Sequence, residues 1–291
     1  MKNYINIDHW YGLFGNNLMQ LAGAIFYAKC CKERTVIRSP KNNFFKIDSE
    51  IEIENEFNFE VESISSLTWG THNYYNSILD YVDLENYKQF LNKNIISTYK
   101  NEIYDLLDKS FNFNQFNDLD LKDTLSIHFR SGDATTTNPH PAYVQSPWSY
   151  FKKIIEKEQP KKVILCTGFG YQNSNMNPCY DKIVNYCIDQ GISIDYRIKS
   201  LPEDVYILSH SEKIVVGGVS TFSLTSSYIN KNCSDIYYPS FFNGGDEFKI
   251  FNPSVNLHLF EFDDYYKMGE WKYDPKKMTE YPEEKITEVY K

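Results

Sequence analysis

Leu125-Ser126-Ile127-His128-Phe129-Arg130-Ser131-Gly132-Asp133 is an apolar strand that runs into two basic side chains and stops at Gly-Asp. In open α/β folds, ligands bind outside the carboxyl ends of the parallel strands. An arginine at such a strand end can hold a nucleotide diphosphate, because its guanidinium binds phosphate through two parallel N–H groups. The alternative is a structural strand end, with His128 a hydrogen-bonded core residue and Arg130 in an ion pair.

Strands and helices alternate on both sides of this stretch. The order strand, glycine turn and small-residue helix opens the chain, and similar units follow Phe129. This spacing predicts an α/β fold with a mostly parallel, doubly wound sheet. The predicted strands cover residues 4–7, 36–37, 125–129, 162–167, 192–196, 213–217 and, as the last one, 235–238. The predicted helices cover residues 18–28, 79–108, 148–157, 180–190, 202–209 and a stretch that ends at Ile229, and turns are expected at 12–17 and 168–170.

The length of 291 residues suits two domains. An Asn-, Asp- and Phe-rich segment, residues 111–123, precedes the strand that begins at Leu125 and is a plausible boundary. We therefore expect an N-terminal α/β domain over 1–121 and a Rossmann-like domain over 122–264. Residues 265–291 form a polar tail that either packs back on the first domain or stays loose.

The chain is acidic. Thirty Lys and Arg residues stand against 39 Asp and Glu residues, which gives a net charge of -9. Because no overall positive field attracts a phosphate backbone, we expect no nucleic-acid partner. A local basic pocket that binds one phosphorylated small molecule remains compatible with this charge, since a single pyrophosphate needs one or two cations and some backbone N–H groups.

The six cysteines show no C-x-x-C spacing. This pattern argues against a zinc site and against a disulfide framework, so we expect reduced thiols. No stretch reaches the roughly 20 apolar residues of a transmembrane helix, and residues 1–7 contain no extended apolar core of a signal peptide. We expect a cytoplasmic location, although a chain trimmed of an anchor would have the same sequence.

Three segments follow predicted strands and precede a loop or a helix: residues 12–17, 128–133 and 217–223. Together they are expected to outline a cleft between the domains, because helix N-termini point free N–H groups at whatever fills it. Ser220, Thr221 and Ser223 add hydroxyl groups at the third segment. The alternatives are an ordinary N-cap there and a tight strand-to-helix connection at Gly12 and Gly15.

These segments resemble motifs of the fucosyltransferase superfamily, most closely those of the α-1,2-fucosyltransferases. The N-terminal motif is similar to Gly12-Leu13-Phe14-Gly15-Asn16-Asn17-Leu18-Met19-Gln20-Leu21-Ala22. The family's His-x-Arg-x-Gly-Asp motif is matched by His128, Arg130, Gly132 and Asp133. Its Ser-Thr-Phe-Ser motif is matched by Ser220-Thr221-Phe222-Ser223, and all three occur in the family's order.

The chain also departs from this family. Ser131 stands where members often carry a second Arg, and Leu224-Thr225 stands where they carry paired aromatic residues. A Ser-Asp-Asp-like stretch is replaced by Cys166-Thr167-Gly168-Phe169-Gly170. These differences leave the donor and the acceptor open.

The resemblance implies a GT-B type glycosyltransferase, with two Rossmann-like domains that face a cleft. Its implied reaction belongs to carbohydrate biosynthesis: L-fucose moves from GDP-fucose to a hydroxyl of a glycan acceptor, with inversion. It also implies no metal and no other cofactor. In this arrangement the first domain lies on the acceptor side and the second binds the nucleotide sugar.

The resemblance further implies roles for single residues. Arg130 would neutralise charge on the departing GDP, a function that suits a fixed guanidinium. The implied substrate-binding residues are Gly15, Asn16, Gln20, His128, Ser220, Thr221, Phe222 and Ser223.

An inverting transfer needs a base for the proton of the acceptor hydroxyl. Asp133 and His140 are the candidates, since a carboxylate or imidazole in the same loop as Arg130 can reach this hydroxyl. Asp133 has the alternative of holding the turn or pairing with Arg130. Tyr143 and Trp148 either stack on an acceptor sugar or pack under the loop.

Other functions remain open. Asp118-Leu119-Asp120 fits a metal-binding Asp-x-Asp, although its polar surroundings favour a solvated loop. A transferase for another nucleotide sugar and a binding module without catalysis are further alternatives, and a structural or interaction protein is a third. The binding module predicts nucleotide binding without turnover, and the structural or interaction protein predicts no nucleotide affinity.

Overall fold

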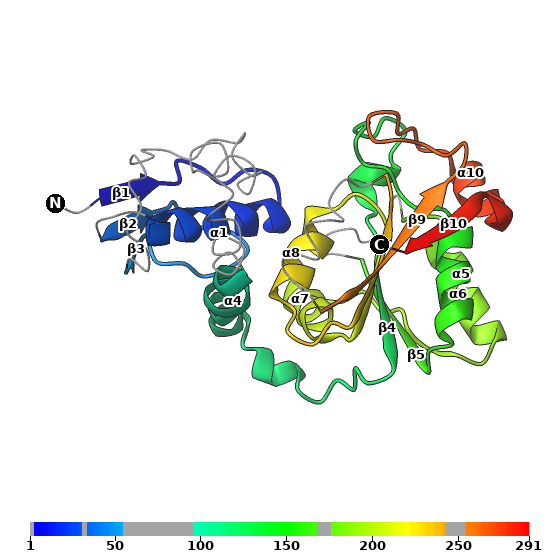
Figure 1. Cartoon of the computed structure of the whole chain (residues 1–291), viewed down its shortest axis with the longest axis horizontal. Helices are drawn as coiled ribbons and strands as arrows, with labels where there is room; N and C mark the ends of the chain where they lie inside the picture. Colours follow the sequence, from blue (N-terminus) through cyan, green and yellow to red (C-terminus); the bar gives the residue numbers. More distant parts are fainter. Residues whose placement is uncertain (1–2, 31–33, 55–95, 168–175, 242–253, 291) are drawn as a thin grey trace. The chain divides into compact units, whose positions relative to one another are not determined.

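A computed structural model describes residues 3–30, 34–54, 96–167, 176–241 and 254–290 of the chain. The chain divides into two compact units, Met1–Gln115 and Phe116–Lys291, and each combines helices with a sheet (Figure 1). The α/β class predicted from the sequence is therefore confirmed. The predicted turn at 168–170 and the first part of the predicted helix 79–108 lie outside the described residues.

Among its described residues, the first unit has a three-stranded sheet in the order β1-β2-β3. Helix α1 connects β1 to β2, which are parallel, while β3 pairs antiparallel with β2. Its small and apolar side chains let α1 pack against β2 and β3. The elements are β1 (Asn3–Asn6), α1 (Phe14–Cys30), β2 (Thr35–Arg38) and β3 (Glu50–Ile53).

Helical structure follows in the first unit, as predicted for residues up to 108. A π-helix, η2 (Thr98–Ile103), runs directly into α4 (Tyr104–Phe111). Asn112 ends α4 in the left-handed conformation, with φ of +52°, which asparagine tolerates better than most residues. A 3₁₀ turn, η3 (Phe113–Phe116), leads on toward the second unit.

In the described part of the second unit, seven strands form one sheet in the order β10-β9-β8-β7-β4-β5-β6. All neighbouring pairs are parallel except β10 and β9. Every residue of β4 is buried, as expected of a central strand covered on both faces. The strands are β4 (Thr124–His128), β5 (Lys162–Cys166), β6 (Ser193–Asp195), β7 (Lys213–Val216), β8 (Asp235–Pro239), β9 (Asn256–Phe262) and β10 (Ile286–Tyr290).

Helices cover both faces of this sheet, as in a doubly wound fold. Figure 1 shows α5 (Trp148–Glu158) and α6 (Cys179–Asp189) on one face, and α7 (Leu201–His210) and α8 (Thr221–Ile229) on the other. Local signals set their ends: the Ser200 hydroxyl accepts from the N–H of Glu203 at the start of α7, with a proline in the first turn.

The strand order reverses between β4 and β7. From β4 the chain passes through α5 to β5, and from β7 it passes through α8 to β8 on the opposite side. The loops that leave these two adjacent strands therefore diverge. This is the topological switch point at which doubly wound sheets bind ligands.

The sequence-based prediction that β8 is the last strand is wrong. Two more strands, β9 and β10, extend the sheet, and β10 runs antiparallel as its outer strand. Residues 265–291, expected as a tail, contain α10 (Pro275–Glu280), η5 (Glu283–Lys285) and β10. α10 packs against α5 and α6, so this segment belongs to the second unit.

The predicted turn over residues 12–17 is shorter than expected, and α1 begins at Phe14. Gly12 makes the turn with φ of +63°, a conformation that favours glycine. The Asn17 amide then donates to the carbonyls of Tyr11 (2.7 Å) and Leu13 (3.0 Å), which fixes the first turn of the helix.

Candidate functional site at the ends of strands β4 and β7

His128, the last residue of β4, is 3% exposed. Its ring lies against Phe222, with ring centroids 5.0 Å apart. Nδ1 is buried without a hydrogen-bond partner among the described residues. The alternative expected from the sequence, a hydrogen-bonded core histidine, is therefore not met at this atom. Burial, and then the charge of Arg130, lower the pKa of His128 to about 3, and the ring is neutral at physiological pH.

Arg130 lies two residues beyond the strand, with a side chain that is 17% exposed. Its Nε donates to Asp133 Oδ1 at 2.8 Å, and its Nη2 donates to Oδ2 at 2.6 Å. The pairing of Asp133 with Arg130 that the sequence suggested is therefore present. Such a bidentate pair fixes the plane of the guanidinium as well as its position.

Tyr143 covers one face of this guanidinium. Arg130 Cζ lies 3.7 Å from the centre of the Tyr143 ring. The exposed ring of His140 lies beside the same tyrosine, with ring centroids 5.0 Å apart. The structure thus brings the three predicted catalytic residues, Arg130, Asp133 and His140, into one cluster around Tyr143.

His140 has one ring nitrogen engaged. Its Nδ1 accepts from the backbone N–H of Ala142 at 3.2 Å. A neutral imidazole that accepts at Nδ1 carries its proton on Nε2. In this arrangement neither ring nitrogen offers a free lone pair to an acceptor hydroxyl.

Two glycines join the segment after β7 to the end of β4. Gly217 N–H donates to the His128 carbonyl at 2.7 Å, and a Cβ on Gly217 would lie only 2.6 Å from that oxygen. Gly218 pairs with the backbone of Gln145 in an isolated β-bridge, and a Cβ on Gly218 would lie 2.7 Å from the Gln145 side chain and from the Val144 carbonyl. Glycine is therefore required sterically at the point where the two loops meet.

The four residues of the Ser-Thr-Phe-Ser motif occupy different surroundings at the start of α8. Ser220 is the N-cap residue by backbone position, and its side chain makes no capping hydrogen bond. Thr221 and Phe222 are half-buried, whereas Ser223 is fully buried and donates to the Ser220 carbonyl at 3.1 Å. In this geometry Ser223 serves the helix, and the N-terminus of α8 presents Thr221 and Phe222.

The predicted residues of the first unit lie around the start of α1. Gly15 is buried in the helix, and Asn16 lies directly opposite Gly12. Gln20 is 1% exposed; its Oε1 accepts from the N–H of Tyr11 at 3.0 Å and its Nε2 donates to the carbonyl of His9 at 3.4 Å. Gln20 therefore holds the β1–α1 loop.

Sequence reasoning missed two supports of the second-unit cluster. Asn177 donates its backbone N–H to Ser131 Oγ at 3.1 Å and its amide to the Arg130 carbonyl at 3.3 Å. Trp271, 2% exposed, donates Nε1 to the Ala134 carbonyl at 2.8 Å. Asn177 and Trp271 are distant in sequence from the residues that they contact. The single sequence signal was Trp271 itself, a large side chain of a type that is usually buried, in a polar stretch.

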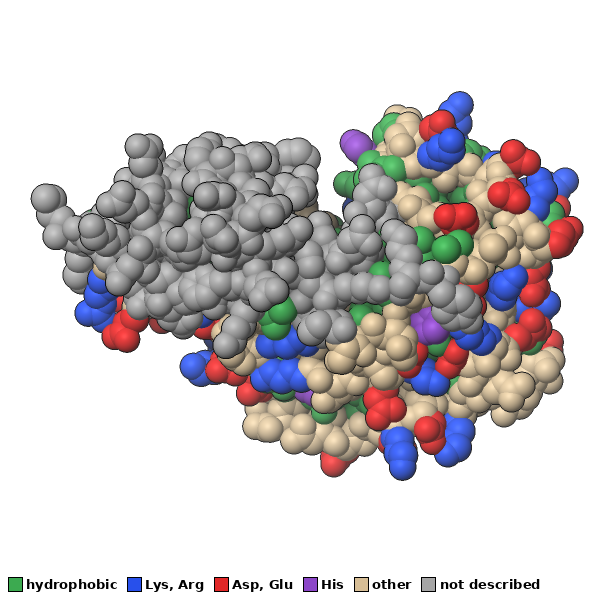
Figure 2. Space-filling view, viewed as in Figure 1, with side chains coloured by type: hydrophobic (Ala, Val, Ile, Leu, Met, Phe, Trp, Pro, Cys, Tyr) green, Lys and Arg blue, Asp and Glu red, His purple; other side chains and the backbone are tan. Residues whose placement is uncertain are grey.

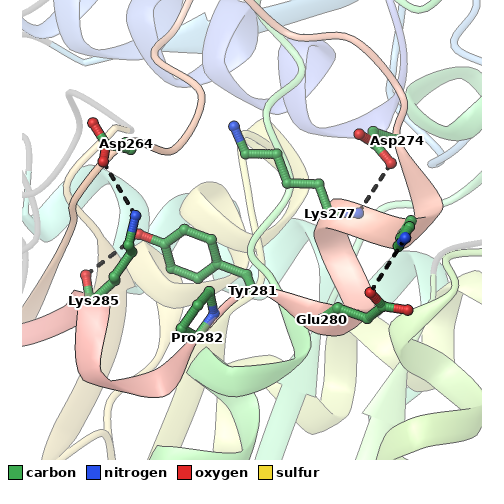
Figure 3. A pocket seen from close by; sticks show the side chains of 8 residues that line it. Asp264, Asp274, Lys277, Glu280, Tyr281, Pro282 and Lys285 are labelled. Atoms are coloured by element: carbon green, nitrogen blue, oxygen red, sulfur yellow. Dashed lines mark hydrogen bonds and ion pairs between the residues drawn. The ribbon is translucent and has the colours of Figure 1, made fainter.

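Other polar features lie apart from this cluster. A pocket of about 350 Å³ is formed by residues 264–285 (Figure 3). Lys285 pairs with Asp264 at 3.1 Å and Lys276 with Glu280 at 3.9 Å. Carboxylates of the pocket itself therefore neutralise both lysines. On the face of the second unit shown in Figure 2, basic and acidic side chains are interspersed.

The Asp118-x-Asp120 pair lies in the connection before β4, where Asp120 accepts from the Lys122 N–H at 3.1 Å. Within the described ranges, His, Cys, Asp and Glu side chains form no group of three or more that could hold a metal ion. None of the helices in these ranges has the length and apolar character needed to cross a membrane.

No protein-family model matches the chain, and no curated protein matches its sequence. Among solved structures, the chain is similar to a crystal structure of POFUT1 in complex with GDP-fucose, with 15% identity and a TM-score of 0.44 over 81% of this chain and 97% of that chain. A complex of POFUT1 with GDP gives 13% identity and a TM-score of 0.40 over 81% and 98% of the two chains. At this identity and TM-score, these two structures do not bear on the activity of this chain.

Proposed function

We propose that this chain is an inverting, metal-independent glycosyltransferase that moves L-fucose from GDP-fucose to a hydroxyl of a glycan acceptor. The proposal joins the three motifs that resemble those of fucosyltransferases to the geometry around β4 and β7. The proposed partners are the nucleotide-sugar donor and the acceptor glycan, and no cofactor is involved.

One observation carries the proposal: Arg130 and the N-terminus of α8 follow adjacent parallel strands at the switch point of the sheet. Cleavage of a glycosyl-phosphate bond leaves negative charge on the β-phosphate. A guanidinium fixed by its neighbours and the N–H groups of a helix N-terminus both stabilise such charge without reorganisation. We assign Arg130 to the leaving group and Ser220, Thr221, Phe222 and Ser223 to the nucleotide pocket, with Thr221 and Phe222 closest to the ligand.

His128 is proposed to bind the substrate as a neutral ring. Its depressed pKa keeps it uncharged beside Arg130, so it adds no second positive charge. Gly15, Asn16 and Gln20 are proposed to line the acceptor side from the first unit, with Gln20 acting through the loop that it holds.

Asp133 is the better placed of the two proposed bases. A carboxylate that pairs with arginine through both oxygens still has lone pairs available on each. His140 has Nδ1 engaged by Ala142 and would need to change tautomer to accept a proton at Nε2. We therefore propose Asp133 as the base and His140 as the alternative.

The cytoplasm is the proposed compartment. Cys166, Cys179 and Cys187 are free thiols, and burial raises the pKa of each. Buried thiols that remain protonated are chemically inert.

Calorimetric titration with GDP, GDP-fucose, UDP and UDP-glucose, in the presence of a chelator, tests the proposal on the wild type, Arg130→Ala and, as a matched basic variant, Lys276→Ala. We expect guanine-selective binding that weakens in Arg130→Ala alone. Binding of uridine nucleotides alone would favour a different donor. Guanine-nucleotide binding without turnover across a glycan-acceptor screen would favour a binding module, and the absence of any binding would overturn the proposal.

A further inference from the structure

We infer that Tyr143 is a positioning residue, which holds the Arg130 guanidinium in the orientation that receives the diphosphate. This inference rests on the proposed function. Asp133 binds the guanidinium from one edge, and Tyr143 covers its face at 3.7 Å. An edge contact and a face contact together restrict both the tilt and the rotation of a planar group.

The tyrosine is itself held in place by its own loop. Its N–H donates to the His140 carbonyl at 2.9 Å, and its carbonyl accepts from the Gln145 amide at 3.0 Å. The next residue, Val144, is fully buried, and its carbonyl accepts from Val219 N–H at 2.9 Å. The backbone that carries the Tyr143 ring is therefore tied to the segment between β7 and α8.

A second anchor comes from the segment that contains Trp271. The Pro141 carbonyl accepts from the N–H groups of Gly269 and Trp271, both at 3.0 Å, and Trp271 Nε1 reaches Ala134. These contacts fix the loop on both sides of His140. A guanidinium ordered before the ligand arrives loses less conformational entropy on binding.

This arrangement argues against the stacking of Tyr143 on an acceptor sugar. One face of the ring is already covered by Arg130, and His140 lies against the same ring at 5.0 Å. A cation–π contact between arginine and tyrosine uses the ring face that a sugar would need.

NMR of protein labelled with ¹⁵N-arginine tests the inference directly, since the chain has four arginines: Arg34, Arg38, Arg130 and Arg197. Loss of one Nε–H signal in Arg130→Lys assigns that of Arg130. In the wild type we expect this signal to be shifted upfield by the Tyr143 ring and to exchange slowly with water. Tyr143→Leu should remove the upfield shift and speed the exchange, although Asp133 still accepts from this N–H, and Tyr143→Phe should keep both effects.

The first unit supplies a matched control. Arg38 Cζ lies 3.8 Å from the centre of the Tyr4 ring, and Arg38 Nε donates to Glu50 at 2.8 Å. Tyr4→Leu should therefore change the Arg38 signal and leave that of Arg130 unchanged. Should Tyr143→Leu fail to fold, nuclear Overhauser effects between the Tyr143 ring and the Arg130 side chain in the wild type decide the question.

Nucleotide titration separates this inference from the proposed function. Tyr143→Leu should weaken GDP binding about 2- to 30-fold, the range of an arginine–aromatic contact, while Tyr143→Phe binds as the wild type does. An Arg130 signal that is indifferent to Tyr143→Leu would overturn the positioning role. An ordered Arg130 in a wild-type protein that binds no GDP would instead refute the proposed function and leave the contact in place.

Discussion

Asp133 holds Arg130 through both of its carboxylate oxygens, at 2.8 Å and 2.6 Å. The carboxylate is 44% exposed and the guanidinium 17%, so the pair lies at the boundary between solvent and the interior. Solvent screens a pair of this kind, and it contributes little to stability. The pair matters for orientation, because it holds the Arg130 guanidinium in a fixed plane for a ligand that binds at the end of β4.

Replacement of this cation should affect the chemical step. Arg130→Ala is expected to lower kcat about 10²- to 10³-fold, the scale for losing one preorganised donor to a developing negative charge. Arg130→Lys should restore little, since an ammonium cannot pair with two oxygens in one plane. Steady-state kinetics measure both values, and full activity of the lysine variant would contradict the role of the planar group.

The choice of base is tested by Asp133→Asn. It keeps the size of the side chain and removes the proton acceptor, so kcat should fall about 10²- to 10⁴-fold. His140→Gln, in the same loop, is the matched comparison and should lose much less activity. GDP titration of both variants separates a lost base from a disturbed Arg130, and a larger loss in His140→Gln would transfer the role to His140.

His128 should make stability depend on pH. Its pKa is about 3 in the folded protein against an ordinary value of 6.5, so between these values the unfolded chain binds a proton that the folded protein excludes. The contribution of His128 to the free energy of unfolding is complete above pH 6.5. Below that pH it falls by about 1.4 kcal/mol per pH unit.

Thermal unfolding of the wild type and of His128→Asn at pH 6.5 and pH 5 measures this effect. Over this interval the wild type should lose about 2 kcal/mol more than the variant does. Equal losses would show that His128 takes up a proton without disrupting the folded protein.

Gly217 should tolerate no side chain. A Cβ there would meet the His128 carbonyl at 2.6 Å and the Phe129 Cβ at 2.8 Å, and neither atom belongs to a flexible side-chain end. Gly217→Ala is expected to cost about 1–3 kcal/mol of stability and to weaken GDP binding. At Gly191 an added Cβ meets no atom within 4 Å, but the φ of +69° strains an alanine, so Gly191→Ala should lose some stability and leave GDP binding unchanged.

Trp271 should stabilise the loop that carries Asp133 and Tyr143. Trp271→Phe keeps most of the buried ring and removes the donor to the Ala134 carbonyl, at an expected cost of about 1–3 kcal/mol. Hydrogen exchange should increase over residues 132–147 in this variant. Unchanged exchange would indicate that the two backbone contacts at Pro141 are sufficient.

The sequence predicted the elements whose side chains follow a period. The β4 strand, the helices α5 to α8 and their order are recovered, because apolar periodicity reports burial on a sheet or a helix face. β9 was missed, although its sequence Asn256-Leu257-His258-Leu259-Phe260-Glu261-Phe262 alternates in part. Its pairing with β8 depends on a long-range register that local patterns do not contain.

The sequence predicted which residues belong to the candidate site better than it predicted which of them contact one another. The His-x-Arg-x-Gly-Asp motif pointed to Arg130 and Asp133, and the shared loop pointed to His140. Tyr143, whose ring contacts both Arg130 and His140, was expected beneath the loop or on a sugar. Loop contacts such as Arg130 with Tyr143 and Trp271 with Ala134 depend on backbone paths that carry no periodic signal. The internal role of Ser223 likewise depends on the exact start of α8.

The two residues joined by the hydrogen bond from Trp271 to Ala134 are synthesised at different times, because 137 residues separate them. A ribosome that adds about 5–20 residues per second needs about 7–27 s to travel this distance. The nascent chain therefore exposes the Arg130 loop long before its anchor exists. The loop is expected to gain its full set of contacts only after Trp271 has been synthesised.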